Sequence, residues 1–293
     1  MSDSLQYNLA RIVRGAVIRL PIGMSTWIAR RAGDLFYVFW AKRRRIAFSN
    51  LNRVFPNSML QYKKREIVRE SFQHIAISFM ELFILRKIKK EAASRFVIEG
   101  FEHLEKALVK GRGVVLVISH LGAWEYLAFL FYLTKTKVSV VVKEIENTYF
   151  DKEITILRRE TGATPIIKRN SVRAILSALR QNQVVAILID QWAGKEGIWV
   201  DFFGNPTSTT SIPARLAKKT GCALVPAYCF RKSSGLYQIQ VHALIDFRPE
   251  HEAWERETTL QLNQLLEEQI HNYPGQWFWG HRRWKARPAD LRA

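Results

Sequence analysis

The sequence has few cysteines, no long uninterrupted apolar run and fewer acidic than basic residues. Its two cysteines, Cys222 and Cys229, lie in an apolar stretch, which excludes a disulfide framework and indicates buried thiols in a reducing compartment. No apolar run approaches the roughly 18 residues that a membrane-spanning helix needs. No cleavable signal with a clean apolar core is visible. Gly-x-Gly-x-x-Gly and P-loop patterns, zinc-spaced Cys/His clusters and Asp-rich calcium loops are also missing, so the sequence indicates no nucleotide site, metal or cofactor.

What the chain has in excess is positive charge. It holds 45 Lys and Arg against 26 Asp and Glu, a formal net charge of +19. Residues 1–60 contain ten of the cations and only two acids, and the last 17 residues add five more cations. A strongly basic surface attracts polyanions such as nucleic acid, anionic lipid headgroups or an acidic protein. Charge alone does not choose among them.

The N-terminal part mixes apolar residues with arginines. Trp27, Phe36, Phe39 and Trp40 are flanked by Arg and Lys, a composition typical of a helix lying in the membrane interface. An amphipathic helical pair packed on its own domain would show the same pattern, and both interpretations can hold together. The sequence therefore predicts a basic, amphipathic, membrane-associating helical segment over residues 1–55, followed by the main domain over 56–293.

Beyond Asn57, strand and helix patterns alternate. Apolar runs predict buried strands at 114–119, 138–142, 184–190 and 223–230, and alternation at 237–245 predicts a strand with one wet face. Helical spacing predicts a helix that starts with a cap at Asn57 or Ser58, one at 101–110, one that ends at about 133 and one that starts at 171. It also predicts a helix from a Ser211 cap to Gly221 and a last helix that ends before Pro274. This order predicts an α/β fold with a mostly covered mixed or parallel sheet flanked by helices.

His120 and Glu125 stand out at the end of the first of these strands, in "VVLVISHLGAWEYLAFL". With seven histidines and 26 acidic residues, one such pair at this spacing arises by chance about as often as not. Context makes it informative, because α/β proteins gather their chemistry where strands end. Within one helix, five residues would turn the side chains about 140° apart. The pair meets if His120 precedes the helix and Glu125 lies in its first turn, with Gly122 allowing a tight turn.

A carboxylate beside a histidine fixes the tautomer of the ring, so that the other ring nitrogen can take a proton from a hydroxyl. No Gly-x-Ser-x-Gly elbow supplies a nucleophile. The residues therefore favour direct attack, in which His120, oriented by Glu125, deprotonates an alcohol that attacks an acyl donor. A strand-end histidine bonded to backbone and a solvated glutamate would be the purely structural alternative.

Four blocks in order, "SHLGAWE", "LIDQWAGKEGIWVDFFGNPTSTT", "LAKKTGCALVP" and "WFWGHRRWKARP", resemble the bacterial lipid A biosynthesis late acyltransferases. This lauroyl/myristoyl transferase family lies within the wider His-x4-Asp/Glu lysophospholipid acyltransferase superfamily. The resemblance runs from about Arg43 to Pro288. It implies transfer of an acyl group from acyl-acyl carrier protein, or acyl-CoA, to a hydroxyl of a lipid A precursor. It also implies a peripheral or monotopic position on an anionic membrane surface, at the cytoplasmic face of the inner membrane.

The resemblance also assigns roles to residues. It implies that His120 and Glu125 are the catalytic pair. The substrate-binding residues that it implies are Arg169, Asp190, Gln191, Gly204, Arg282 and Arg283. From the residues alone, Asp190 ends a buried strand and either caps a loop or lines the site, Gly204 belongs to a Phe-Phe-Gly turn, and the two C-terminal arginines suit a phosphate-rich headgroup or a cation–π-packed segment.

Two positions depart from the family pattern. Ala123 stands where Asn is usual, and Trp192 where a second acid is usual. They keep open an acyltransferase of the same fold acting on another glycolipid, a lysophospholipid or an aminoacyl lipid. A basic nucleic-acid-binding protein is a third hypothesis. It is disfavoured because no reading module is visible and the aromatic residues cluster with apolar ones, so we expect no nucleic-acid partner.

Overall fold

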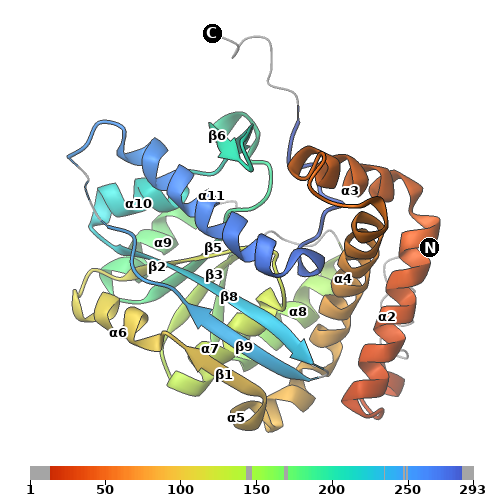
Figure 1. The fold of residues 1–293 in the computed structure, drawn as a ribbon. Helices are drawn as coiled ribbons and strands as arrows, with labels where there is room; N and C mark the ends of the chain where they lie inside the picture. The colour runs from red at the N-terminus through yellow and green to blue at the C-terminus, as the bar shows by residue number, and fades with distance from the viewer. Residues whose placement is uncertain are drawn as a thin grey trace.

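The computed structural model of the chain describes residues 14–142, 147–167, 171–233, 235–246, 248 and 250–285. Across these residues a seven-stranded sheet forms the centre, in the order β1-β9-β8-β2-β5-β3-β4. Figure 1 shows this sheet surrounded by helices. Its strands are β1 Phe96–Glu99, β2 Val114–Ile118, β3 Val138–Val142, β4 Ala163–Ile167, β5 Val184–Leu188, β8 Ala223–Ser233 and β9 Leu236–Val241. Neighbouring strands pair in parallel except β8 and β9, which are antiparallel.

Helices flank this sheet and join its parallel strands. They are α2 Ile22–Phe39, α3 Ala41–Val54, α4 Gln61–Lys90, α5 Ala92–Arg95, α6 Phe101–Val109, α7 Ala128–Thr134, α8 Thr148–Glu160, α9 Ser171–Arg180, α10 Ile212–Thr220 and α11 Trp254–Asn272. Short 3₁₀ turns lie at η1 Trp124–Leu127, η3 Gly194–Glu196 and η4 Pro274–Gln276, and β6 Ile198–Phe202 and β7 Asn205–Thr209 form a separate hairpin. The predicted α/β class, with a largely parallel sheet between helices, is confirmed.

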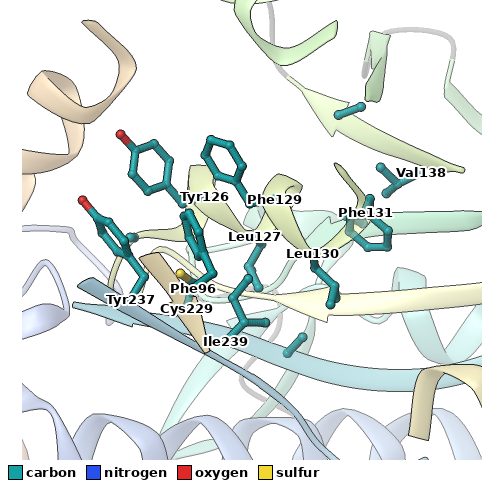
Figure 2. Packing of buried hydrophobic residues seen from close by; sticks show 14 of the residues in the cluster. Phe96, Tyr126, Leu127, Phe129, Leu130, Phe131, Val138, Cys229, Tyr237 and Ile239 are labelled. Carbon is teal, nitrogen blue, oxygen red and sulfur yellow. The ribbon is translucent and has the colours of Figure 1, made fainter. Parts of the chain in front are cut away.

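Both faces of the sheet are buried, which explains why its central strands are apolar throughout. Along β2, Leu116 and its alternate neighbours face a cluster formed with α4, α6 and α7. Val115 and Val117 face the opposite cluster, formed with α9, α10 and α11. In the first cluster the ring of Phe96 stacks on Phe129 and on Tyr237, with centroids 4.7 and 5.0 Å apart (Figure 2). Within this core β2 and β5 pair directly as parallel strands, and their ends carry the candidate site.

Most of the predicted elements form, and the differences have local causes. The helix expected to start with a cap at Asn57 or Ser58 begins at Gln61, with Leu60 at the N-cap position and no capping side chain. Ser211 does precede α10, but its side chain forms no capping hydrogen bond, whereas Gly221 ends that helix in the left-handed conformation as predicted. The features that were not predicted include β1, the short helix α5, the α8–β4 unit and the β6–β7 hairpin.

The N-terminal helices pack on the rest of the chain through α4. Gly33 of α2 lies directly against the backbone of α4, where a Cβ would overlap Gln73. The neighbouring Asp34 accepts hydrogen bonds from Arg69 Nε and Gln73 Nε2, both at 2.7 Å. None of the helices in the described ranges is long and apolar enough to cross a membrane. The division of the chain at residue 55 stays a prediction, and residues 1–13 of that segment lie outside the described ranges.

Candidate active site

His120 and Asp190 meet because β2 and β5 are adjacent parallel strands in a fixed register. Ile118 pairs with Leu188 at the last position of the ladder, and the Ile189 amide donates to the Ile118 carbonyl at 3.1 Å. Two residues beyond that pair, the same register places His120 opposite Asp190. The Nδ1 atom of His120 lies 2.8 Å from Oδ1 of Asp190. The carboxyl edge of the sheet thus carries a histidine–carboxylate pair.

Asp190 is buried, and both of its carboxylate oxygens accept hydrogen bonds. Its second oxygen, Oδ2, accepts a hydrogen bond from the indole Nε1 of the buried Trp277 at 3.1 Å. Burial alone would raise the pKa of Asp190, but the charge of His120 and the hydrogen bonds from His120 and Trp277 hold it below its usual range. The carboxylate is therefore ionised at neutral pH and accepts from His120. Nδ1 carries the proton, and Nε2 of the neutral ring is left as the basic nitrogen.

The environment of His120 adjusts its basicity. Burial lowers the pKa of the imidazole, but the charge and hydrogen bond of Asp190, aided by the charge of Glu125, raise it above the ordinary histidine value. The side chain keeps 28% of its surface exposed. Trp124 lies edge-on to the ring, with centroids 5.3 Å apart. The site thus presents a stabilised, partly open base to whatever approaches Nε2.

Glu125 does not make the contact that the sequence predicted for it. Its carboxylate forms a two-pronged ion pair with Arg158 of α8, from Nη2 to Oε1 at 2.7 Å and from Nε to Oε2 at 3.1 Å. The carboxylate that orients His120 by a hydrogen bond is Asp190 instead. The physical reason is register: the strand ends bring Asp190 to Nδ1, while η1 directs Glu125 toward α8. Glu125 remains close enough for its charge to raise the pKa of His120.

Gly122 makes the turn between His120 and Glu125 possible. Its φ is +67°, and a Cβ there would overlap the carbonyl oxygen of Cys229. The chain passes so close to β8 that the Ala123 amide donates to that same carbonyl at 2.7 Å. The expectation that this glycine allows a tight turn after the strand is confirmed.

Replacing Gly122 by alanine is therefore expected to lower the free energy of unfolding by at least about 2 kcal/mol, because strain and overlap add. Gly204→Ala is the matched control: its φ is +65°, but nothing lies within 4 Å of the added Cβ, so only the backbone cost of about 1 kcal/mol applies. Urea unfolding of the two variants gives the comparison. Equal losses would show that contact with β8 contributes nothing at position 122.

Gln191 and Gly204 occupy different surroundings. The side-chain amide of Gln191 lies 3.5 Å from His120 Nε2, so this predicted site residue borders the basic nitrogen. Gly204 sits in the two-residue turn of the β6–β7 hairpin, between the paired Phe202 and Asn205. Phe203 and Gly204 both have positive φ, +52° and +65°, as the tight hairpin turn that suits twisted strands requires. This turn geometry by itself explains why a glycine stands at position 204.

The predicted arginines separate into three cases. Arg169 lies outside the described residues. Arg282 is exposed, whereas Arg283 is fully buried. The guanidinium of Arg283 donates to the Ser208 carbonyl at 2.8 Å and to Thr209 Oγ1 at 2.6 Å. Arg283 therefore holds the C-terminal segment to β7, and its position favours a structural role over direct contact with a headgroup.

Four residues near His120 were not singled out from the sequence as site residues: Trp124, Arg158, Trp277 and His281. The backbone amide of Trp192 donates to Nε2 of His281 at 3.4 Å. Burial lowers the pKa of His281 to about 4, so its ring is neutral at neutral pH. The "WFWGHRRW" block could have suggested Trp277 and His281, but only the fold brings this segment to the strand ends. Among the described residues, no group of three His, Cys, Asp or Glu side chains is placed to hold a metal ion.

Comparison with known proteins gives a consistent result over nearly the whole chain. A family model described as "Bacterial lipid A biosynthesis acyltransferase" matches residues 3–286. The lipid A biosynthesis lauroyltransferase of Escherichia coli K12 is 27% identical over 281 residues, 94% of this chain and 90% of the relative. The lipid A biosynthesis palmitoleoyltransferase of the same organism is 25% identical over 283 residues, 92% and 88%. A phosphatidylinositol mannoside acyltransferase of Mycobacterium tuberculosis H37Rv is 30% identical over 154 residues, 51% and 48%.

Proposed function

Because the chain belongs to the bacterial lipid A biosynthesis acyltransferase family, we propose that it moves a fatty acyl group from an acyl thioester to a hydroxyl of a lipid A precursor. Its named relatives are acyltransferases, so the chain is an acyltransferase. The observation that carries the mechanism is the 2.8 Å hydrogen bond between His120 Nδ1 and Asp190 Oδ1. It leaves Nε2 as a base aimed at an acceptor hydroxyl.

In the proposed reaction, Nε2 of His120 takes the proton of the acceptor hydroxyl as that oxygen attacks the thioester carbonyl carbon. Asp190 stabilises the resulting imidazolium. The tetrahedral intermediate collapses, the carbon–sulfur bond breaks, and His120 returns its proton to the departing thiolate. Ester and free thiol are formed, and the enzyme is regenerated. No covalent acyl-enzyme is needed. The nearby thiol of Cys229 supports this route, because it is fully buried and burial raises its pKa above the ordinary thiol range.

Glu125 and Arg158 are assigned a supporting part in this scheme. Their ion pair joins η1, just after the catalytic turn, to α8. The negative charge of Glu125 helps to raise the pKa of His120, and the pair holds the turn that carries the base. Glu125 thereby stays in the catalytic pair proposed from the sequence, but it acts through its charge and position and not through a hydrogen bond to the ring.

The donor is proposed to be an acyl-acyl carrier protein, with acyl-CoA as the alternative. α3 carries exposed cations at Lys42, Arg45 and Arg53. Arg43 of the same helix donates to the Gly280 carbonyl at 3.1 Å, which places this basic helix beside the His281 segment of the site. An acidic carrier would be attracted to such a surface. The test compares kcat/KM for the two thioesters at low and high salt. A carrier held by charge should lose kcat/KM as the salt concentration rises, and a freely diffusing one should not.

The membrane position is proposed from α2. Its large apolar side chains Trp27, Leu35 and Phe39 are 60%, 57% and 79% exposed, although α2 packs on α4 along its other side. Exposed apolar side chains next to arginines suit the interface of an anionic bilayer. We place the protein on the cytoplasmic face of the bacterial inner membrane, held there without crossing it, with residues 1–55 as the associating segment.

Phe39→Glu is expected to weaken binding to anionic vesicles by ten-fold or more, because a buried Phe contributes about 1.5–3 kcal/mol and the new charge is repelled. Val109→Glu, at the end of α6 and 87% exposed, is the matched control and should leave binding unchanged. Co-sedimentation with vesicles measures both. If the two variants bind equally, α2 is not the membrane contact.

The reaction itself is tested by mass. Purified enzyme is incubated with a lipid A precursor and acyl carriers of different chain length, and the precursor should gain the mass of one fatty acid less one water. A specific observation also favours a second acceptor: one relative is named for phosphatidylinositol mannoside, and Ala123 and Trp192 depart from the usual motif beside the site. If a deletion strain has unchanged lipid A but altered glycolipids or lysophospholipids, that second acceptor class replaces the first.

A further inference from the structure

A pocket of about 330 Å³ lies apart from His120 and Asp190, neither of which lines it. It is lined from α2, α4, the β8–β9 end of the sheet and η4. Gln276 is shared by the two regions: its side chain lines the pocket, while its carbonyl accepts from the Gly122 amide at 3.0 Å. The next residue, Trp277, bonds to Asp190. The proposed reaction uses no residue that lines this pocket.

Its floor is a buried polar network. Arg231 pairs with Glu81, with Nε 2.7 Å from Oε1, and both side chains are less than 10% exposed, at 7% and 4%. Arg231 also donates to Nδ1 of His74 at 3.0 Å and to Ser78 Oγ at 2.7 Å. An arginine only donates, so His74 accepts through Nδ1 and carries its own proton on Nε2. Burial and the charge of Arg231 lower the pKa of His74, which is therefore a neutral N–H donor in the pocket lining.

Charged residues of both signs also line the pocket. Arg30 of α2 and Lys232 of β8 are exposed cations that line the pocket. Glu70 of α4 lines it as well, half-buried, and no side chain in the described residues forms an ion pair with it. Burial and the neighbouring Glu66 raise the pKa of Glu70 against the opposing charges of Arg30 and Lys63, and a cation bound beside it would lower that pKa. At Gly275 a Cβ would overlap the Glu70 carboxylate, so the absence of a side chain there leaves room for that group.

These groups match a ligand that carries a phosphate and a primary ammonium. Arg30, Lys232 and the His74 N–H suit the phosphate, and Glu70 suits the ammonium. A simple anion would leave Glu70 facing it, and a simple cation would face Arg30 and Lys232. Thr26 and Arg30 line the pocket from α2, the helix that also exposes Trp27. A headgroup in the pocket would therefore have its acyl tails beside the proposed membrane face.

We propose that this pocket binds the headgroup of a phospholipid carrying a phosphate and a primary ammonium, as in phosphatidylethanolamine, separately from the acyl acceptor. The lipid, rather than free phosphoethanolamine, is favoured because α2 places an exposed apolar surface next to the pocket. This inference rests on the proposed membrane position of α2. It does not depend on the identity of the acyl acceptor.

The test uses the purified full chain and short-chain lipids below their micelle concentration, with binding measured by calorimetry. Dihexanoyl phosphatidylethanolamine is expected to bind about ten-fold more tightly than dihexanoyl phosphatidylcholine, whose quaternary ammonium cannot donate to Glu70. Glu70→Gln should remove that preference, and Arg30→Gln should weaken both lipids alike. Glu105→Gln, which removes an exposed carboxylate of α6 outside the pocket lining, is the matched control and should change neither.

Several outcomes would overturn the proposal. Equal binding of the two lipids by the unmodified protein would do so, as would a preference that survives Glu70→Gln. Soluble phosphoethanolamine binding as tightly as the lipid would overturn the assignment to a membrane lipid. His120→Ala should retain full binding of phosphatidylethanolamine, and its loss would place the lipid in the catalytic site instead. Because that variant lacks the proposed base, its lipid binding is measured without acyl transfer, and the binding result does not depend on the proposed reaction.

Discussion

His120→Ala is expected to lower kcat for acyl transfer by about 10³-fold or more while leaving the fold intact. Removing the base costs the proton transfer and the orientation of the attacking hydroxyl together. The side chain is partly exposed, and its loss leaves Asp190 still bonded to Trp277, so the variant should fold, with a loss of about 1–3 kcal/mol for the unpaired Asp190 oxygen. Initial rates with a lipid A precursor and acyl-acyl carrier protein measure the first effect, and urea unfolding measures the second.

His251→Ala provides the matched control for that experiment. His251 is an exposed histidine paired with Glu257 of α11, and it should keep the rate of the unmodified enzyme. Full activity of His120→Ala would remove the proposed mechanism altogether. A small loss, of ten-fold or less, would mean that the acceptor hydroxyl is deprotonated elsewhere and that His120 only lines the site.

The location of His120 could be predicted from the sequence because the information is local. An apolar run, a histidine at its end and a glycine two residues later specify a strand, its carboxyl edge and a tight turn. A second apolar run, at 184–190, specifies the strand that ends near Asp190 in the same way. For α/β proteins these signals are strong, since strands buried on both faces are apolar along their whole length.

The partner of His120 could not be predicted in the same way. His120 and Asp190 are 70 residues apart, the same offset as every pair in the β2–β5 ladder. Had these two strands been known to be neighbours in that register, the contact would have followed. Strand order is a tertiary property, however, and β5 pairs with β2 and β3 rather than with a strand next to it in sequence.

The contact predicted between Glu125 and His120 is absent for a related reason. The nearness of Glu125 to His120 in sequence suggested contact, but Arg158 competes for the carboxylate from α8, a helix that the sequence reasoning did not predict. A bidentate arginine pair is stronger than a hydrogen bond to a neutral imidazole. Trp277 and His281 stand in the C-terminal block "WFWGHRRWKARP", whose sequence does not show where it packs. Their contacts with Asp190 and Trp192 span 87 and 89 residues, which no local pattern reveals.

Asp190→Asn separates the roles of the two carboxylates, and it is expected to lower kcat/KM by about 10³–10⁴-fold. The amide cannot stabilise the imidazolium, and its NH₂ group can hold the ring in the tautomer with the proton on Nε2. Since the catalytic base must be neutral, activity falls as the pH drops below the pKa of His120. In the unmodified enzyme Asp190 raises that pKa, so the acidic limb of the pH–rate profile should lie above the ordinary histidine value of about 6.5.

In Asp190→Asn, burial acts on the ring without the main opposing charge, so the acidic limb of the residual activity should move to lower pH. Glu125→Gln is the matched comparison, because it removes a carboxylate whose charge raises the same pKa but which forms no hydrogen bond to the ring. It should lower kcat/KM by roughly ten-fold and move the limb in the same direction by less. The reverse ranking, with Glu125→Gln the more severe variant and Asp190→Asn nearly active, would mean that Glu125 leaves Arg158 and takes over Nδ1 when substrate binds.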